Sequence, residues 1–318
     1  MKLKIGLIGL GHLGKIHLKC IREIEEIHFQ GIFDVDIEIA KELSAQYQIP
    51  AYISYETLLD DIDAIVIVTP TTTHFELAKR AIEKGKHCFI EKPVTSTLEE
   101  ANALIALQEK YGVKVQVGHV ERFNPAFLAA SPYIKNPKFI EAHRLSMFKP
   151  RGTDVSVVHD LMIHDLDLIS FIAKSELKEI RASGVAIVSP TADICNARIE
   201  YKNGLVANVT ASRISLKTMR KIRIFQEDAY MSLDFQSKES EIFTLNETYQ
   251  ENSFELETYK GNRYISQIAI DTNSVNAILE EIKSFSKSIV TNTETEVNLK
   301  DGTRALELVD IILKQIER

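Results

Sequence analysis

The sequence has 318 residues, of which 45% are hydrophobic and 26% are charged. These values are ordinary for a globular protein, and the length suits two domains that each bury a core. The net charge of −7 at pH 7, without a local cluster of Lys and Arg, argues against nucleic-acid binding. The cysteines Cys20, Cys88 and Cys195 lack disulfide or metal-site spacing, which favours a reducing, cytoplasmic environment.

Membrane association and secretion are not expected from the sequence. No apolar stretch approaches the roughly 20 residues that a membrane-spanning helix needs. The apolar run after the first four residues is short and broken by glycines, unlike a secretion signal. We therefore expect no membrane partner.

The first part of the chain alternates short β-branched runs with amphipathic stretches, the pattern of a parallel sheet with helical crossovers. We predict helices over residues 12–24, 37–47, 74–84 and 98–111. We predict strands over residues 4–9, 29–34, 64–69, 88–90 and 113–117. Residues 1–120 are therefore expected to form a doubly wound α/β domain of the Rossmann type.

The pattern changes in residues 121–318, where strands dominate. We predict a strand over 139–148 and helices over 123–133, 157–171, 274–290 and 301–316. Residues 179–259 carry consecutive strands without helices between them. Such strands favour an open, mostly antiparallel sheet, so an α+β domain is expected to follow the Rossmann domain.

A glycine-rich segment, GLGHLG, links the first predicted strand to the first helix. In this GxGxxG motif, Gly9 permits a tight turn, Gly11 lets the backbone approach a pyrophosphate, and Gly14 lets the helix pack closely on the strand. His12 and Leu13 lie in the same loop and are assigned to cofactor binding with it. A glycine-rich turn without a ligand is the alternative.

Asp34 ends the second predicted strand, 20 residues beyond Gly14, at the offset expected of a ribose-binding carboxylate. It would accept hydrogen bonds from the adenosine ribose hydroxyls and repel a 2′-phosphate. The motif therefore predicts a site that prefers NAD to NADP, a preference that Asp36 or a nearby cation could alter.

Two further segments follow predicted strands and reach the carboxyl edge of the sheet, where doubly wound folds bind ligands. The first of these segments contains Thr73. Because Thr73 is also a fair N-cap, a structural role is equally consistent with this segment. That segment contributes four candidate cofactor contacts: Thr69, Pro70, Thr71 and His74.

The second segment, Glu91-Lys92-Pro93, follows the fourth predicted strand. A lysine at this edge can serve catalysis, so Glu91 and Lys92 are candidate cofactor contacts and Lys92 is also a candidate for contact with the substrate. A solvated surface lysine is the alternative.

A third feature lies on the apolar helix predicted over 157–171. Asp160, His164 and Asp167 are spaced four and three residues apart, which places them on one face of an α-helix. A His–Asp pair is suited to proton transfer. A purely structural trio and a divalent-metal site are the alternatives, and we expect no metal.

In combination, these motifs resemble the Gfo/Idh/MocA oxidoreductase family, and the resemblance covers essentially the whole chain. Besides GLGHLG and the strand end at Asp34, its markers are VTPTTTH, EKP, VGHVERFNP, DLMIHDLDL and DGTRALELV. The resemblance implies a substrate-binding C-terminal sheet domain that is often used for oligomerisation, hence a homodimer or homotetramer. It also implies hydride transfer between a nicotinamide and a hydroxyl-bearing carbon of a sugar, sugar nucleotide or cyclitol.

The family's catalytic lysine, aspartate and histidine correspond to Lys92, Asp160 and His164. In the reaction that this implies, His164 takes the hydroxyl proton, Lys92 hydrogen-bonds the reacting oxygen, and Asp160 orients His164 or relays its proton. Lys92 and His164 would both contact the substrate.

Substrate identity is less defined, because the glycine run that many relatives carry before the aspartate is mostly absent from residues 152–158. The VGHVERFNP stretch is most similar to members that act on nucleotide-linked amino sugars, such as UDP-N-acetylglucosamine 3-dehydrogenases. Arginines suit a pyrophosphate-bearing substrate, and surface positions are their alternative. The candidate substrate contacts are Arg122, Asn124, Arg144 and Arg151.

Other functions remain open at this point. The same scaffold could serve as a non-catalytic NAD-binding sensor or regulator, although Lys92, Asp160 and His164 argue against it. A reductase of a non-sugar substrate, such as a bilin or dihydrodiol, would not need the His–Asp pair. A metal-dependent activity is a third option.

Overall fold

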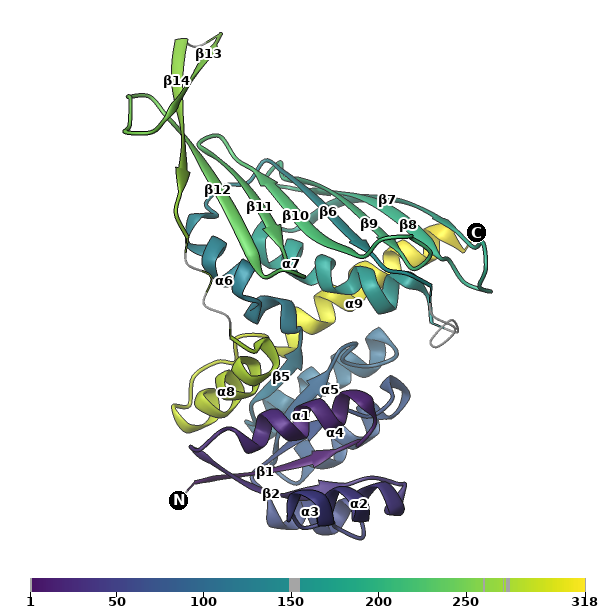
Figure 1. The fold of residues 1–318 in the computed structure, drawn as a ribbon. Coiled ribbons are helices and arrows are strands. Elements are labelled where there is room, and N and C mark those ends of the chain that lie inside the picture. The colour runs from purple at the N-terminus through teal and green to yellow at the C-terminus, as the bar shows by residue number, and fades with distance from the viewer. Residues whose placement is uncertain (1, 149–154, 260, 271, 273–274, 318) are drawn as a thin grey trace. The chain divides into compact units, whose positions relative to one another are not determined.

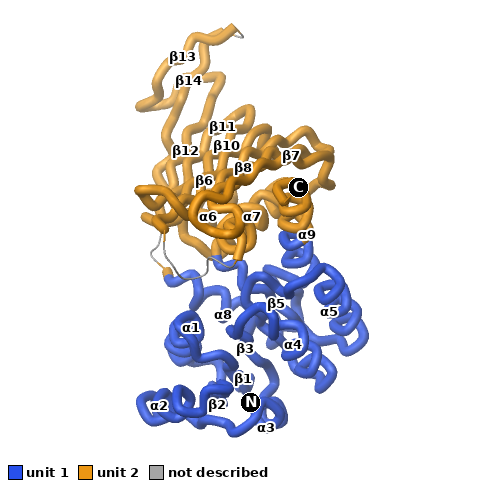
Figure 2. Tube along the Cα trace, turned by 90° about the vertical axis from the view of Figure 1, so that its right-hand side faces the viewer, with its two compact units in different colours: residues 1–120, 276–306 blue, residues 121–275, 307–318 orange. Residues whose placement is uncertain are grey.

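The computed structural model describes residues 2–148, 155–259, 261–270, 272 and 275–317. The chain divides into two compact units (Figure 2). Unit 1 comprises residues 1–120 and 276–306, and unit 2 comprises residues 121–275 and 307–318. The expected second domain, 121–318, is therefore not continuous.

Unit 1 is built on five parallel strands in the order β2-β1-β3-β4-β5. Strand β2 lies on one side of β1 and β3 lies on the other, so the order in which the chain adds strands reverses there. Doubly wound sheets bind ligands at such a position. The parallel Rossmann-type sheet expected from the sequence is confirmed. The strands are β1 Leu3–Ile8, β2 Ile27–Phe33, β3 Ala64–Ile67, β4 His87–Glu91 and β5 Val115–Gly118.

The helices α1 to α5 of unit 1 lie between successive strands of its sheet, whereas α8 follows β14 in the chain and α9 (Leu299–Ile316) begins in this unit. The sequence did not predict α3, because it has only seven residues and its N-cap, Ser54, was not singled out. The helices are α1 His12–Arg22, α2 Ile37–Tyr47, α3 Tyr55–Asp61, α4 His74–Glu83, α5 Leu98–Tyr111 and α8 Ala277–Val290.

Helix α8 belongs to unit 1 because its apolar face completes the core there. Ile282 and Phe285 are fully buried in a cluster that includes Leu18 and Ile21 of α1 and Phe89 of β4. The Phe89 and Phe285 rings meet edge to face with centroids 6.0 Å apart. Burial of each such side chain contributes about 1.5–3 kcal/mol, so this segment stabilises the first unit although it follows most of the second in the chain.

Unit 2 contains an open sheet of nine strands in the order β13-β14-β12-β11-β10-β6-β9-β8-β7. All neighbours are antiparallel except β6 and β9, so the mostly antiparallel sheet expected from the sequence is confirmed. The strands are β6 Phe139–Leu145, β7 Leu177–Val185, β8 Ile194–Tyr201, β9 Val206–Ser212, β10 Met219–Phe225, β11 Ala229–Asp234, β12 Glu239–Asn246, β13 Phe254–Thr258 and β14 Gly261–Ile268.

The helices of unit 2 are less regular than the sequence predicts. The stretch expected over 123–133 is divided because Asn124 caps a new helix, α6, which has Pro125 in its first turn. The helix expected over 157–171 begins with a π-helical turn. The observed elements are 3-10 turns at Val120–Phe123 and Ser131–Tyr133, α6 Pro125–Ala130, the π-turn Val158–Met162 and α7 Ile163–Ala173.

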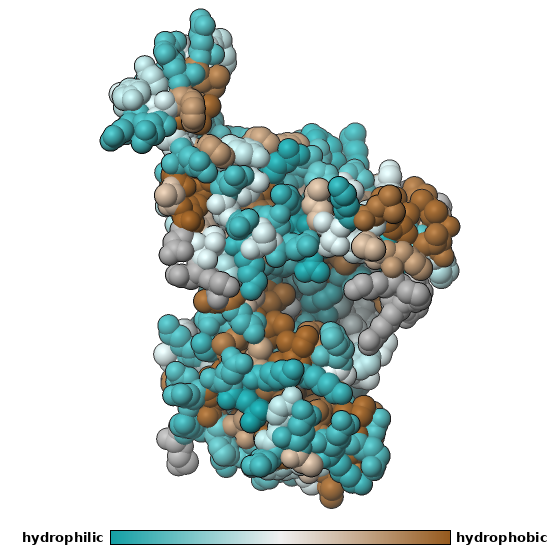
Figure 3. All heavy atoms as spheres, in the orientation of Figure 1, coloured by the Kyte–Doolittle hydropathy of each residue, from teal (hydrophilic) through white to brown (hydrophobic). Residues whose placement is uncertain are grey.

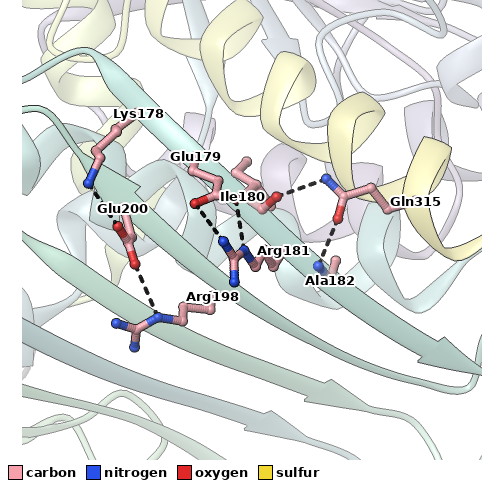
Figure 4. Close-up of polar contacts among 8 residues, drawn as sticks. All are labelled: Lys178, Glu179, Ile180, Arg181, Ala182, Arg198, Glu200 and Gln315. Atoms are coloured by element: carbon pink, nitrogen blue, oxygen red, sulfur yellow. Dashed lines mark hydrogen bonds and ion pairs between the residues drawn. The ribbon is translucent and has the colours of Figure 1, made fainter.

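The free edge of β7 is covered by the end of α9 (Figure 4). Gln315 donates from Nε2 to the Ile180 carbonyl over 2.9 Å, and its Oε1 accepts from the Ala182 N–H over 2.8 Å. These bonds satisfy edge groups that could otherwise pair with another strand. Beside them, Figure 4 shows exposed pairs of Lys178 with Glu200, Arg198 with Glu200 and Arg181 with Glu179.

The opposite end of the sheet is a projecting hairpin of β13 and β14 (Figure 1). Tyr249, Phe254, Leu256 and Tyr259 on or beside this hairpin are exposed. Figure 3 shows hydrophobic atoms among hydrophilic ones on it. Within the described residues, no helix is long and apolar enough to cross a membrane.

The closest backbone approach in the glycine motif fixes α1 against the end of β1. Gly9 has a φ of 91°, which favours glycine, and a Cβ atom on Gly14 would lie 1.9 Å from the Gly9 carbonyl oxygen. At Gly11, by contrast, a Cβ atom would meet no other atom within 4 Å. Gly14 is therefore required by packing, whereas Gly11 is not.

We expect Gly14→Ala to lower the free energy of unfolding by at least about 2 kcal/mol, because the backbone must shift to admit the methyl group. Gly11→Ala, three residues away, should change it by less than about 0.5 kcal/mol. Urea denaturation of both variants measures the difference. Equal stability of the two variants would contradict the close approach.

Candidate active site

The N-terminus of α1 is arranged to receive an anion. Gly11, its N-cap, makes no side-chain capping bond, and the first turn carries no acidic residue. The helices α2, α3 and α5 are instead capped by Asp36, Ser54 and Thr97. The N-cap residue of α1 therefore supplies no side chain to the first N–H groups of the helix. The open space at Gly11 leaves room for a phosphate beside these groups.

Asp34 lies against this glycine loop. Its Oδ2 accepts from the Leu10 N–H over 2.6 Å, and its Oδ1 accepts from the Asp36 N–H over 2.9 Å. The Asp36 carboxylate turns the other way and caps α2 by accepting from the N–H groups of Glu38 and Ile39. The two neighbouring acids thus have separate roles, and Asp34 is the one positioned beside the phosphate cradle.

The segment after β3 includes the half-buried Thr69 and Thr71 and the exposed Pro70. His74 is 1% exposed, and its ring nitrogens Nδ1 and Nε2 each lie 2.9 Å from a carbonyl oxygen, of Pro93 and Thr69 respectively. A neutral ring donates to one of these carbonyls, and a protonated ring donates to both. The His74 ring thus joins the loops after β3 and β4, and its direct contact with a cofactor stays a prediction.

Glu91, another predicted cofactor contact, also joins two segments of unit 1. It is 7% exposed, and its Oε1 lies 2.7 Å from Nε2 of the fully buried His17 on α1. Its Oε2 accepts from the backbone N–H of Lys92 over 3.1 Å. The carboxylate is thus occupied inside unit 1, whereas Lys92 is half-buried at the carboxyl edge of the sheet. The peptide bond between Lys92 and Pro93 is cis.

In unit 2, Asp160 lies within the π-helical turn, and His164 is the second residue of α7. The α-helical spacing assumed for the trio does not apply across this junction, and the burial of its members differs. Asp160 is exposed, His164 is half-buried and Asp167 is 1% exposed. π-turns are rare and frequently mark functional sites, which fits a role for Asp160 and His164 but not for Asp167.

Asp167 is instead half of a buried ion pair. Nε and Nη2 of Arg122 donate to the two Asp167 carboxylate oxygens over 2.9 and 2.6 Å. The Arg122 guanidinium also lies 4.4 Å from the centroid of the Phe171 ring. Two of the Arg122 nitrogens are therefore occupied by Asp167, and the contact of Arg122 with a substrate stays a prediction. The metal-site alternative loses Asp167 as a ligand.

Arg144 is held in the same way by two acids. Nε and Nη2 donate to Asp165 over 3.0 and 2.8 Å, and Nη1 donates to Glu121 over 2.8 Å. Burial would lower the pKa of Arg144, but the charges and hydrogen bonds of Asp165 and Glu121 outweigh it and raise that pKa. Arg144 is 3% exposed and all three of these nitrogens are held by acids, and its contact with a substrate stays a prediction.

Asn124, the third predicted contact, is also committed to the fold. Its Nδ2 donates to Glu121 and to the Phe235 carbonyl, and its Oδ1 accepts from the Ala126 N–H at the start of α6. The fourth, Arg151, lies outside the described residues, as do residues 152–154 of the segment in which the family's glycine run is absent.

Sequence reasoning missed the residues that fix these loops. His17 lies on the buried face of α1 with Leu18 and Ile21, and a histidine at such a position requires a polar partner. That signal could have identified the pairing with Glu91. No comparable periodic signal marks Glu121 or Asp165. Their partner is Arg144 on β6, which is 23 residues from Glu121 and 21 residues from Asp165 in the sequence.

A parallel sheet with an anion cradle after β1, a carboxylate after β2 and a lysine after β4 defines a dinucleotide-binding oxidoreductase. Comparison with known proteins agrees. The model of an oxidoreductase family with an NAD-binding Rossmann fold, GFO/IDH/MocA, matches residues 3–119, and the GFO/IDH/MocA C-terminal domain matches residues 129–232. The chain belongs to the GFO/IDH/MocA oxidoreductase family.

Two relatives span nearly the whole chain. UDP-N-acetylglucosamine 3-dehydrogenase from Acidithiobacillus ferrooxidans is 37% identical, over 96% of this chain and 94% of its own. A solved structure of that enzyme superimposes with a TM-score of 0.90 at 34% identity, covering 100% of this chain and 98% of the other. Myo-inositol 2-dehydrogenase from Thermotoga maritima is 25% identical over 99% of this chain and 96% of its own.

The buried position of Arg144 leads to a stability prediction. Arg144→Met should lower the free energy of unfolding by about 3–5 kcal/mol, because it leaves Asp165 and Glu121 buried without their cation. Arg198→Met, at an exposed pair with Glu200, should change it by less than about 0.5 kcal/mol. Denaturant titration provides the measurement, and a stable Arg144→Met protein with weakened substrate binding would support the predicted substrate contact.

Proposed function

We propose that this chain is a dehydrogenase that uses NAD to oxidise a secondary hydroxyl of a sugar, sugar nucleotide or cyclitol, reversibly. The observation that carries the proposal is the convergence of the glycine cradle, Asp34 and Lys92 at the carboxyl ends of the strands of one parallel sheet. The near full-length similarity to a UDP-N-acetylglucosamine 3-dehydrogenase favours a nucleotide-linked amino sugar as the substrate.

The residues of unit 1 fit a bound NAD. The first turn of α1, including His12 and Leu13, would offer backbone N–H groups to the pyrophosphate, with Gly9, Gly11 and Gly14 making the approach possible. Thr69, Pro70 and Thr71 would line the same edge of the sheet after β3. Asp34 would accept hydrogen bonds from the ribose, and its charge would repel a 2′-phosphate.

The chemistry divides between the cofactor and the side chains. NAD, when bound, supplies the hydride acceptor. Lys92 donates a hydrogen bond to the reacting oxygen and stabilises the negative charge that develops there. His164 accepts the hydroxyl proton, and Asp160 orients the imidazole or relays that proton. Asp160 lies within the π-turn, and its side chain is exposed there.

A second copy of the chain is the proposed partner. The outer face of the unit 2 sheet carries a row of aromatic rings with neighbouring centroids 5.1–6.2 Å apart, and the projecting hairpin exposes further apolar side chains. Such surfaces are typical of self-association, which supports a homodimer or homotetramer. The row consists of Phe139, Phe225, Tyr230 and Phe243.

We expect Lys92→Ala and His164→Ala each to lower kcat for UDP-N-acetylglucosamine with NAD by at least about 100-fold, because each removes a group that acts on the reacting hydroxyl. The exposed Lys84→Ala is the matched control and should keep the wild-type rate. Absorbance of NADH gives the rates, and the fluorescence of added NADH verifies that each variant still binds the cofactor. Full turnover in both variants would show that the catalytic assignment is wrong.

Cofactor preference tests Asp34 separately. Asp34→Ser should reduce the ratio of kcat/KM for NAD over NADP by about tenfold or more, since a repulsion worth about 1.4 kcal/mol is removed. Asp36→Ser is the neighbouring control: because serine is an equivalent N-cap, it should change the stability by less than about 0.5 kcal/mol and leave the ratio unchanged. An effect of Asp36→Ser on the ratio, with none from Asp34→Ser, would reverse the assignment.

A further inference from the structure

One buried carboxylate connects α1 to the residue that follows β4. The Glu91 side chain uses Oε1 for Nε2 of His17, 2.7 Å away, and Oε2 for the backbone N–H of Lys92, 3.1 Å away. His17 is fully buried and Glu91 is nearly so. The backbone at Lys92 is therefore tied, through one side chain, to a helix distant in sequence.

The chemistry of the pair defines which atom donates. A carboxylate only accepts, so the proton lies on Nε2 of His17. Nδ1 of His17 is buried without a hydrogen-bond partner among the described residues, and the ring packs 5.6 Å from the Phe89 ring. Burial would raise the pKa of Glu91, but the hydrogen bond and charge of His17, together with Lys92, lower it. An ionised acceptor in a dry site makes this a strong bond.

A divalent cation is the alternative interpretation of this cluster. His17, Glu91 and Glu281 of α8 offer ligand atoms that all lie within 4.8 Å of one another. Two ligands bound at about 2.0–2.1 Å to one ion lie about 3 Å apart in tetrahedral or octahedral geometry. The 2.7 Å between His17 and Glu91 matches a hydrogen bond from an imidazole N–H to a carboxylate better, and three fully or nearly buried side chains leave little access for water.

We propose that His17 is a positioning residue that acts through Glu91 to fix the backbone, and hence the side chain, of Lys92. The inference rests on the proposed catalytic role of Lys92. Its consequence is that the helix that begins at the glycine cradle also sets the position of the lysine. On the other side of Lys92, the His74 ring contacts the Pro93 carbonyl. The residues that precede and follow Lys92 are therefore each in contact with a histidine.

Two amide substitutions that differ only in reach test this role. The side-chain nitrogen of His17→Gln can occupy the place of Nε2 and donate to Glu91, whereas His17→Asn is one methylene shorter and cannot reach it. Ile21→Val, on the same buried face of α1, controls for general loosening of the core. The intact protein is used throughout, with NAD and UDP-N-acetylglucosamine as the assay pair.

We expect the Lys92 amide proton to exchange with solvent at least about tenfold faster in His17→Asn than in wild type. We also expect kcat to fall about 10–100-fold, with the KM for UDP-N-acetylglucosamine changed by less than about threefold, because a misplaced group of this kind acts on the chemical step. His17→Gln should stay within about threefold of wild type in both exchange and kcat. Ile21→Val should match wild type.

Equal behaviour of His17→Gln and His17→Asn in amide exchange would overturn the proposal and leave His17 a packing residue. The proposal would also be overturned if the purified wild-type protein contained one equivalent of divalent metal and the His17→Gln variant had lost that metal. Lys92→Ala, measured in parallel, separates the two levels of inference. If Lys92→Ala retains turnover, the proposed function has failed, whereas the exchange rate of the Lys92 amide still decides whether His17 fixes that backbone.

Discussion

The contact between Gly14 and the Gly9 carbonyl is the constraint on which the rest of unit 1 depends. It brings the first turn of α1 against the end of β1, with no room for a side chain between them. The same placement directs uncapped N–H groups to the switch point of the sheet and carries His17 down the helix to Glu91. A cradle for phosphate and a support for Lys92 thus follow from one close approach of two backbone segments.

Buried charge pairing plays the corresponding part in unit 2. Arg144 is enclosed by two carboxylates, and Arg122 forms a two-pronged pair with Asp167 of α7. Each pair requires its partners at fixed positions, because an unpaired charge in such surroundings costs several kcal/mol. We infer that the Arg144 pair anchors α7, and with it the turn that presents Asp160 and His164, to β6 of the sheet. The Arg122 pair anchors α7 to the 3-10 turn Val120–Phe123.

Much of the fold was predictable because it depends on local signals. The helices α2 and α5 begin and end where the spacing of apolar residues and their caps place them. The π-turn was not predictable, since its backbone pattern has no distinct period, and neither was the return of α8 to unit 1, which depends on distant packing. At the site, strand ends indicated Asp34 and Lys92. The burial of Arg122 and Arg144 was not predictable, because long-range pairing and not residue type decides it.

The central claim is that a hydride passes between a nicotinamide and a hydroxyl-bearing carbon. UDP-N-acetylglucosamine carrying deuterium at C3 tests it most directly, because C3 is the position named for the similar enzyme from Acidithiobacillus ferrooxidans. After incubation with the protein and NAD, mass spectrometry should find the deuterium in the reduced cofactor. Reduced cofactor without deuterium would contradict the proposed position, and no reduced cofactor at saturating concentrations of both compounds would contradict the proposed substrate.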